Sequence, residues 1–313
     1  MKTFSEIKSL LSYVSKTANA YDTSYQFMIK FFNDSVRTIC NIRGGDWRFL
    51  KQTTTLTGVT GQDFYLLPQE FRSIITVVDN SDTSNPVPLR PVLNDNSQDG
   101  DYRIHTNNDF KCLEIEFVDK SFVAGGISGK SYKVYGRIKP VDLSADDYTT
   151  GTVSGTASSS FTYTDLTGSG TTFTSAMVGR YIKFANNNNW YRITDFTDAT
   201  HIEIYTNKQV FTLSGSTYTI AELCILPEAY IMAPVYRAMA LHQQINNPTS
   251  PSSATVWWNL YDGGYEAGQS RVYGGIIGQM LEVEGKTLDT NSIAPNRGMV
   301  PDPLLDIPNN III

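Results

Sequence analysis

The sequence predicts an α+β protein: a helical bundle from both chain ends, a central antiparallel β-sandwich, an inserted small β-module and an extended C-terminal arm. Apolar residues recur at helical spacing near both ends, and they alternate with period two from Thr53 to Lys139. A proline-rich stretch from Asn291 to Ile313 closes the chain. The expected boundaries are 1–50 plus 226–275 for the bundle, 51–140 plus 217–225 for the sandwich, 150–216 for the module and 276–313 for the arm.

Two helices are expected at the N-terminus. Thr3 and Glu6 have the spacing of a capping box before a short amphipathic helix. A longer helix follows, capped by Asp22 and ended by Gly44-Gly45, because glycine readily adopts the left-handed conformation that ends helices. Its apolar face comprises Tyr25, Met28, Ile29, Phe32, Val36, Ile39 and Cys40.

Short strands separated by turn residues are expected to build the sandwich. They cover 53–57, 64–67, 73–78, 101–106, 111–118 and 131–138. Proline cannot donate a ladder hydrogen bond, so Pro86 to Pro91 is expected to be irregular or at a sheet edge.

The inserted module begins in a low-complexity stretch. Of the 28 residues Thr149–Ala176, 20 are Gly, Ser or Thr, as in a disordered linker. Exposed strands are expected instead, because large apolar residues recur and need burial: Val153, Phe161, Tyr163, Leu166 and Phe173. Further strands are predicted at 178–184, 190–194 and 201–205, with a hairpin turn at Asn186–Asn189. Thr217–Leu226 is predicted to pair with Tyr132–Ile138, which would place the whole insert in one hairpin loop.

Two more helices are expected before the arm. The first starts at Pro227, is kinked by Pro234 and ends near Asn246. The second is capped by Ser252 or Ser253 and runs to about Val272, and the helical pattern ends past Gly274.

An aromatic block connects the long helix to the first strands. Asp46-Trp47-Arg48-Phe49-Leu50 is followed by a Thr-rich strand and then by Phe64 to Arg72. The residues expected to pack helix against sheet are Trp47, Phe49, Leu50, Tyr65, Leu67, Pro68 and Phe71. This arrangement resembles the head-to-tail adaptor (connector) proteins of tailed, especially short-tailed, bacteriophages. The resemblance covers 1–140, resumes near Leu223 and is interrupted by the insert.

Composition and charge restrict the function classes. With 25 Lys and Arg against 31 Asp and Glu, the net charge is −6, and no basic run offers a tight site for nucleic-acid phosphates. Three scattered cysteines, Cys40, Cys112 and Cys224, predict buried thiols rather than disulfides or a zinc site. The start lacks a signal-peptide pattern, and no apolar run of about 18 residues occurs, which predicts a soluble protein of a reducing cytosol.

No enzyme motif is found, so neither catalysis nor a cofactor nor a metal site is expected. The sequence has no phosphate-binding loop, no nucleophile elbow and no zinc-protease motif. Tyr181, Trp190 and Tyr191 form a candidate aromatic platform for a glycan or a tail contact, although the core of a small β-module would explain them as well.

The resemblance implies a structural virion protein at the head–tail junction, present in the host cytoplasm during assembly. It implies a twelve-membered ring beneath the portal protein that extends the DNA channel without binding DNA specifically and docks a tail hub, nozzle or neighbouring tail ring, with no membrane partner. A C-terminal arm would grip the portal, through Pro301, Leu304, Leu305, Ile307, Ile311, Ile312 and Ile313. The alternatives are another tail ring or tube component, or a tail protein that binds glycan or hydrolyses cell wall.

Overall fold

The computed structural model describes residues 1–15, 23–42, 47–59, 61–92, 101–109, 112–118, 129–246, 252–263 and 275–283. It is an α+β fold with helices and extensive antiparallel sheets. The chain divides into two compact units, one of residues 1–33 with 142–257 and the other of 34–141 with 258–313. Each unit therefore combines a segment from the N-terminal part of the chain with one from the C-terminal part.

The N-terminal helices form as the sequence predicts. Helix α1 spans Phe4–Ser15 and α2 spans Thr23–Asn41. The capping box is confirmed: the Thr3 amide donates to Glu6 Oε2 at 3.0 Å, and the Glu6 amide donates to Thr3 Oγ1 at 3.2 Å. On α2 the predicted stripe is buried at Met28, Phe32, Val36, Ile39 and Cys40. The predicted cap Asp22 and stop Gly44-Gly45 lie outside the described residues.

Two antiparallel sheets share one core in the first β region. One has the order β1-β7-β3-β4 and the other β2-β6-β5. The strands are β1 Lys51–Thr57, β2 Phe64–Leu66, β3 Phe71–Asp79, β4 Val87–Pro88, β5 Tyr102–Asn107, β6 Cys112–Phe117 and β7 Ser131–Ile138, and β1 follows a short 3-10 turn, Arg48–Leu50. Alternate residues of both sheets enter the core, among them Tyr65, Ile115 and Tyr132. This is the packing of the predicted sandwich.

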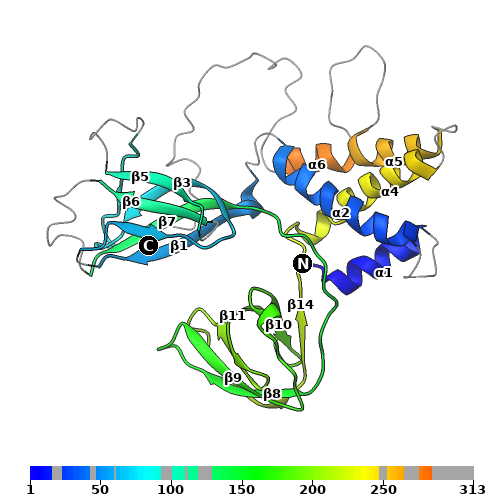
Figure 1. The fold of residues 1–313 in the computed structure, drawn as a ribbon. Coiled ribbons are helices and arrows are strands. Elements are labelled where there is room, and N and C mark those ends of the chain that lie inside the picture. Colours follow the sequence, from blue (N-terminus) through cyan, green and yellow to red (C-terminus); the bar gives the residue numbers. More distant parts are fainter. Residues whose placement is uncertain are drawn as a thin grey trace. The chain divides into compact units, whose positions relative to one another are not determined.

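Seven antiparallel strands form a curled sheet in the second β region (Figure 1). Their order is β13-β8-β9-β12-β11-β10-β14. The strands are β8 Thr152–Ala157, β9 Tyr163–Ser169, β10 Tyr181–Phe184, β11 Trp190–Asp198, β12 His201–Tyr205, β13 Phe211–Ser216 and β14 Tyr218–Ala221, with a 3-10 turn at Ser175–Met177. The Gly/Ser/Thr-rich stretch forms strands as predicted, and Asn186–Asn189 lies in the turn between β10 and β11. Of the residues expected to need burial, Phe161 and Tyr163 are instead exposed.

One predicted strand pairing is wrong. The segment Thr217–Leu226 was expected beside β7, but its strand β14 pairs with β10, and Ile220 forms a further bridge with Tyr148. Strand β7 has no free edge for another strand, because β1 and β3 already occupy its two sides. The returning strand therefore completes the curled sheet.

The C-terminal helices differ from the prediction at three points. Pro227 precedes a 3-10 turn, Glu228–Tyr230, and α4 begins only at Met232 and runs to Asn246. Pro234 thus lies in the first turn of α4. Backbone N–H groups in the first turn have no carbonyl partner within the helix, so proline removes no helical hydrogen bond there and need not kink the helix. Helix α5, Ser252–Asp262, is followed at once by Gly263 at φ +87 and so ends well before Val272.

The helical pattern continues past Gly274, contrary to the prediction. Helix α6 spans Gly275–Val283 and buries Ile277, Met280 and Leu281. Gly275 has φ +54, and a Cβ there would lie 2.6 Å from the Leu260 carbonyl oxygen, so glycine allows this helix start to approach the end of α5. Gly275 and Gly278 are poor helix formers, so the sequence of this short segment does not predict a helix.

Candidate functional site

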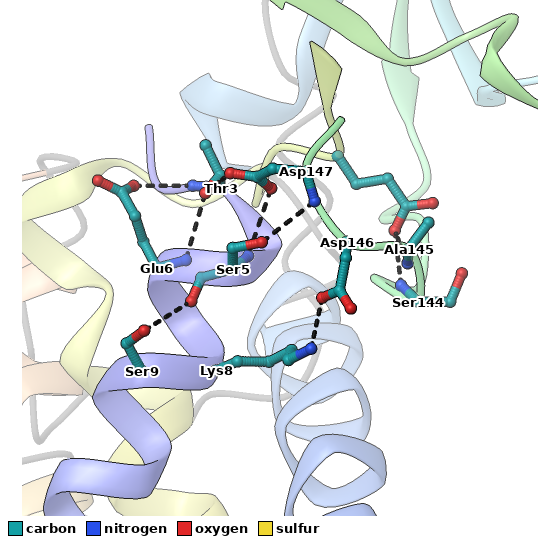
Figure 2. Close-up of polar contacts among 10 residues, drawn as sticks. Thr3, Ser5, Glu6, Lys8, Ser9, Ser144, Ala145, Asp146 and Asp147 are labelled. Atoms are coloured by element: carbon teal, nitrogen blue, oxygen red, sulfur yellow. Dashed lines mark hydrogen bonds and ion pairs between the residues drawn. The ribbon is translucent and has the colours of Figure 1, made fainter. Parts of the chain in front are cut away.

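The segment 142–148, between β7 and β8, is bound to the first turn of α1 (Figure 2). We call it the connecting segment. Thr3 Oγ1 donates to Asp147 Oδ2 at 2.9 Å, the Asp147 amide donates to Ser5 Oγ at 3.1 Å, and Lys8 forms an ion pair with Asp146. Asp147 also lies at the N-terminal end of α1, where a carboxylate stabilises the free amides of the first turn.

Glu222, directly after β14, holds the same segment from the other side. Its Oε2 accepts hydrogen bonds from the Ser144 amide at 2.5 Å and the Ala145 amide at 3.0 Å. Its Oε1 lies 3.9 Å from Arg180 Nε. One carboxylate thereby accepts from two consecutive peptide groups, at exposed Ser144 and half-buried Ala145, and charge-assisted bonds of this kind are stronger than neutral ones.

Two further contacts fix the ends of the connecting segment. The side-chain amide of Asn33 donates to the Leu143 carbonyl at 3.0 Å and accepts from the Leu143 amide at 3.1 Å. At the other end, the Tyr148 and Ile220 backbones exchange two hydrogen bonds of 2.8 Å. The segment is therefore bound along its length to α1, to α2 and to the end of the curled sheet.

The first residues of the chain are bound to the same place. Thr3 forms a β-bridge with Leu223, so that the Phe4 amide donates to the Glu222 carbonyl at 3.1 Å. Lys2 Nζ lies 3.0 Å from Glu228 Oε1, and this hydrogen bond, with the charges of Glu6 and Glu228, raises the pKa of Lys2. The same contact lowers the pKa of Glu228. We call this whole set of contacts among residues 1–8, 142–148 and 220–228, with Asn33, the N-terminal hub.

The acidic groups of the hub serve as fixed hydrogen-bond acceptors. Asp146 and Asp147 bind residues of α1 and its cap that lie more than 130 positions away in the sequence. The described partners of Asp146, Asp147 and Glu222 are the Thr3 hydroxyl, the Ser5, Ser144 and Ala145 amides, and the Lys8 and Arg180 side chains. The hub thus binds α1, Asn33 of α2 and the end of the curled sheet to the connecting segment.

We expect Glu222→Gln to weaken the hub. The neutral amide keeps one oxygen acceptor, but it loses the charge that strengthens the bonds from Ser144 and Ala145 and the ion pair with Arg180. The expected loss is about 1–2 kcal/mol of unfolding free energy, measured by urea denaturation. Hydrogen exchange at Ser144 and Ala145 should quicken more than exchange in β12, and equal protection in both proteins would contradict this assignment.

The predicted packing motif separates into two places. Trp47 and Leu50 are fully buried, and Trp47 Nε1 donates to the Ile39 carbonyl at 2.7 Å, at the end of α2, while the Phe49 ring stacks on Trp47 at 5.6 Å. Tyr65 and Leu67 instead lie in the core between the two sheets of the sandwich.

The last two motif residues shape a tight turn. Pro68 accepts a hydrogen bond from the Phe71 amide at 3.0 Å. Phe71 is buried against Gly136 of β7, where a Cβ would lie 2.5 Å from the Phe71 ring and 2.7 Å from the Ser73 carbonyl oxygen. The ring thus occupies the space that the missing side chain leaves.

The three residues of the candidate aromatic platform do not share a face. Tyr191 is buried in the core of the curled sheet, and its hydroxyl bonds to Gln209 and Asn187, so its ring is unavailable to a ligand. Tyr181 and Trp190 are half-buried on the opposite face. The residues predicted for the portal-binding arm, Pro301, Leu304, Leu305, Ile307, Ile311, Ile312 and Ile313, lie outside the described residues.

The three cysteines are free and buried. Burial raises the pKa of the Cys224 thiol to about 11. Because the thiolate is the reactive form, Cys224 is expected to be inert in the folded protein.

We therefore expect none of the three cysteines to react appreciably with iodoacetamide at pH 8 while the protein is folded, and all three to react in urea. Mass spectrometry of the alkylated peptides measures the difference. Rapid labelling of Cys224 without denaturant would show that the hub opens in solution.

Glu116 and His105, two titratable residues of the sandwich, contact each other. Glu116 accepts from Arg103 at 3.1 Å and contacts His105 at 2.7 Å on one sheet face. Within the described residues, no cluster of three or more His, Cys, Asp or Glu is placed to hold a metal ion. Within the same residues, no helix combines the length and apolar character needed to cross a membrane.

The hub was missed by sequence reasoning because its partners are far apart in the chain. One signal was present: Asn33 follows Phe32 and precedes Val36 on the buried side of α2, where a polar residue needs a partner. The identity of that partner, Leu143, could not be read from the sequence.

Comparison with known proteins gives one similarity. No curated protein and no solved structure matches the chain. The matching family model covers α1, α2, both sheets of the sandwich, the connecting segment and the first residues of β8, which is just under half of the chain; the rest of the curled sheet lies outside the match. Residues 3–153 match the model described as SU10 adaptor protein, and this match indicates a phage adaptor family.

Proposed function

We propose that this protein is a structural adaptor subunit at the head–tail junction of a phage virion. The observation that carries the proposal is the match of residues 3–153 to an adaptor family. It favours a non-enzymatic component of the virion that interacts with other capsid and tail proteins. Twelve copies would form a ring beneath the portal protein, extend the DNA channel and present a docking site for a tail hub, nozzle or neighbouring tail ring.

Features of the chain support this proposal. A ring subunit must transmit force between neighbours without unfolding, and the hub binds α1 and the curled sheet together by at least three charged side chains. The net charge of −6 suits a channel through which DNA passes without being held, since tight phosphate binding needs clustered cations. In this arrangement Asp22–Arg43 would pack between subunits or line the channel, and the β regions would face outward or toward the tail.

The deciding experiment is the native mass of the purified chain, alone and mixed with the portal ring of the same phage. A complex with about twelve copies per portal ring, set by the symmetry of a closed ring, is the expected result. A chain that does not bind the portal but binds another tail ring would instead be a component of a different tail layer. The portal-proximal assignment would then be wrong. Release of sugars or peptides from host cell wall would favour the hydrolase alternative.

Attachment to the portal is proposed to reside in 291–313. Deleting 296–313 is expected to abolish portal binding and to leave the far-UV circular dichroism and the thermal midpoint unchanged. Replacing Leu304 and Leu305 by serine in the full chain is the matched point variant. Undiminished portal binding by both variants would remove the arm from the proposal and leave the adaptor assignment itself standing.

A further inference from the structure

We propose that the outer face of the curled sheet binds an uncharged carbohydrate. Four side chains form a row across four neighbouring strands: Tyr163, Tyr205, Arg192 and Tyr181 are direct cross-strand partners on β9, β12, β11 and β10. Direct partners in an antiparallel sheet project from the same face. At ~4.8 Å between strands the row is about 14 Å long. We call it the aromatic row.

The aromatic row faces away from the core. The residues that alternate with it, Thr164, Ile204 and Ile182, are buried, whereas Tyr163 is 50% and Tyr205 39% exposed. The two exposed rings meet edge to face with centroids 5.6 Å apart, so each fixes the orientation of the other. A fixed ring loses little conformational entropy when a ligand packs on it.

A fourth aromatic side chain, Trp190, extends this surface. Trp190 lies two residues before Arg192 on β11, hence on the same face, and is the direct partner of Lys183 on β10. The Lys183 ammonium lies 5.9 Å from the Trp190 ring centre.

An amide cluster lies at the end of the same strands. Asn189 Nδ2 donates to Gln209 Oε1 at 3.1 Å, which joins the β10–β11 turn to the β12–β13 loop. In that loop Asn207 and Lys208 have φ of +49 and +61, a conformation that is uncommon outside glycine and that costs energy. The Tyr205 hydroxyl donates to Asn207 Oδ1 at 3.3 Å, so the loop is bound to the aromatic row.

Carbohydrate is the ligand class that fits these groups together. A sugar ring presents an apolar C–H face, which packs on an aromatic ring, and a rim of hydroxyls, which neutral amides can both donate to and accept from. This face carries charges of both signs: the cations are Lys183 and Arg192, and the carboxylates are Glu203 and its two cross-strand partners, Asp165 on β9 and Asp195 on β11. Cations placed among carboxylates form no continuous basic strip for a polyanion such as nucleic acid, and the aromatic rings and neutral amides suit an uncharged ligand.

The test is affinity electrophoresis of the full chain in native gels cast with dextran, mannan, galactan or soluble starch. At least one polysaccharide is expected to retard the protein relative to an empty gel. The double variant Tyr163→Ala/Tyr205→Ala should bind about tenfold more weakly or worse, because it removes both exposed rings. Tyr13→Ala, which removes an 83% exposed tyrosine from α1, is the matched control and should migrate as the native chain does.

A second readout separates ligand contact from loss of folding. Trp190 fluorescence should change when the retarding polysaccharide is added, and the change should disappear in Trp190→Phe. If the double variant does not fold, Tyr163→Ser alone replaces it.

Three results would overturn the proposal. The first is the absence of retardation by every polysaccharide. The second is equal retardation of the double variant and the native chain. The third is that no polysaccharide binds the native chain and the double variant no longer binds the portal or a tail protein. This face would then be a protein-docking surface, since tyrosine, tryptophan and arginine also dominate protein interfaces.

Discussion

Trp47→Ala is expected to lower the unfolding free energy by about 3–5 kcal/mol, the largest loss of any single substitution considered. The indole is fully buried and stacks on Phe49. Its Nε1 donates at 2.7 Å to the backbone carbonyl of Ile39. This carbonyl is one of the last four of α2, and the last four carbonyls of a helix have no N–H partner within the helix. The substitution therefore removes both apolar contacts and the partner of a buried carbonyl. Urea denaturation followed by far-UV circular dichroism measures the loss.

One variant separates the apolar contacts from the hydrogen bond, and a second serves as a control. Trp47→Phe keeps most of the apolar volume but not the donor, and it should lose about 1–3 kcal/mol, the cost of one unsatisfied buried group. Phe161→Ala removes a 65% exposed aromatic ring and should stay within about 0.5 kcal/mol of the native chain. A Trp47→Ala protein as stable as the Phe161→Ala control would show that α2 ends without the indole.

Local patterns in the sequence identify the elements well. Three features were predicted close to their observed positions: the capping box of Thr3 and Glu6, the buried stripe of α2 and the strands of the sandwich. Each of them depends on residues that are near one another in the chain. Trp47 was likewise singled out as a packing residue because a large aromatic block follows a long amphipathic helix.

Pairing between distant segments was harder to predict. The sequence shows that Thr217–Leu226 is a strand but not that β7 already has neighbours on both sides, which is a property of the assembled sheet. Alternation likewise distinguishes the two faces of a strand without saying which is buried. Tyr191 was therefore grouped with Trp190, although neighbours on a strand point to opposite faces and Tyr191 is in the core.

The hub could not be predicted for a related reason. Asp146, Asp147 and Glu222 are acidic residues near turns, and such residues are normally solvated. Only the fold brings Asp146 to the Lys8 ammonium, Asp147 to the Ser5 amide, and Glu222 to the amides of Ser144 and Ala145. A family match of the first half of the chain gives no information on Glu222, which lies beyond it.

Asn33→Ala is expected to cost about 2–4 kcal/mol, because it leaves both the amide and the carbonyl of buried Leu143 without partners, at about 1–3 kcal/mol each. Asn33 is 9% and Leu143 4% exposed, so water does not readily replace the lost bonds. The two hydrogen bonds connect α2 to a segment 110 residues later in the chain. The measurements are the urea-denaturation free energy and the hydrogen-exchange rate of the Leu143 amide.

Asn33→Asp tests the direction of each bond. The carboxylate can still accept from the Leu143 amide, but it cannot donate to the Leu143 carbonyl and places a negative charge beside that oxygen, so this variant should also be destabilised while the Leu143 amide stays protected from exchange. Asn246→Ala, at the exposed end of α4, should change neither quantity. If Asn33→Ala left exchange at Leu143 unchanged, the contacts of Asp146, Asp147, Tyr148 and Glu222 would hold the connecting segment without Asn33, and the hub would not include α2.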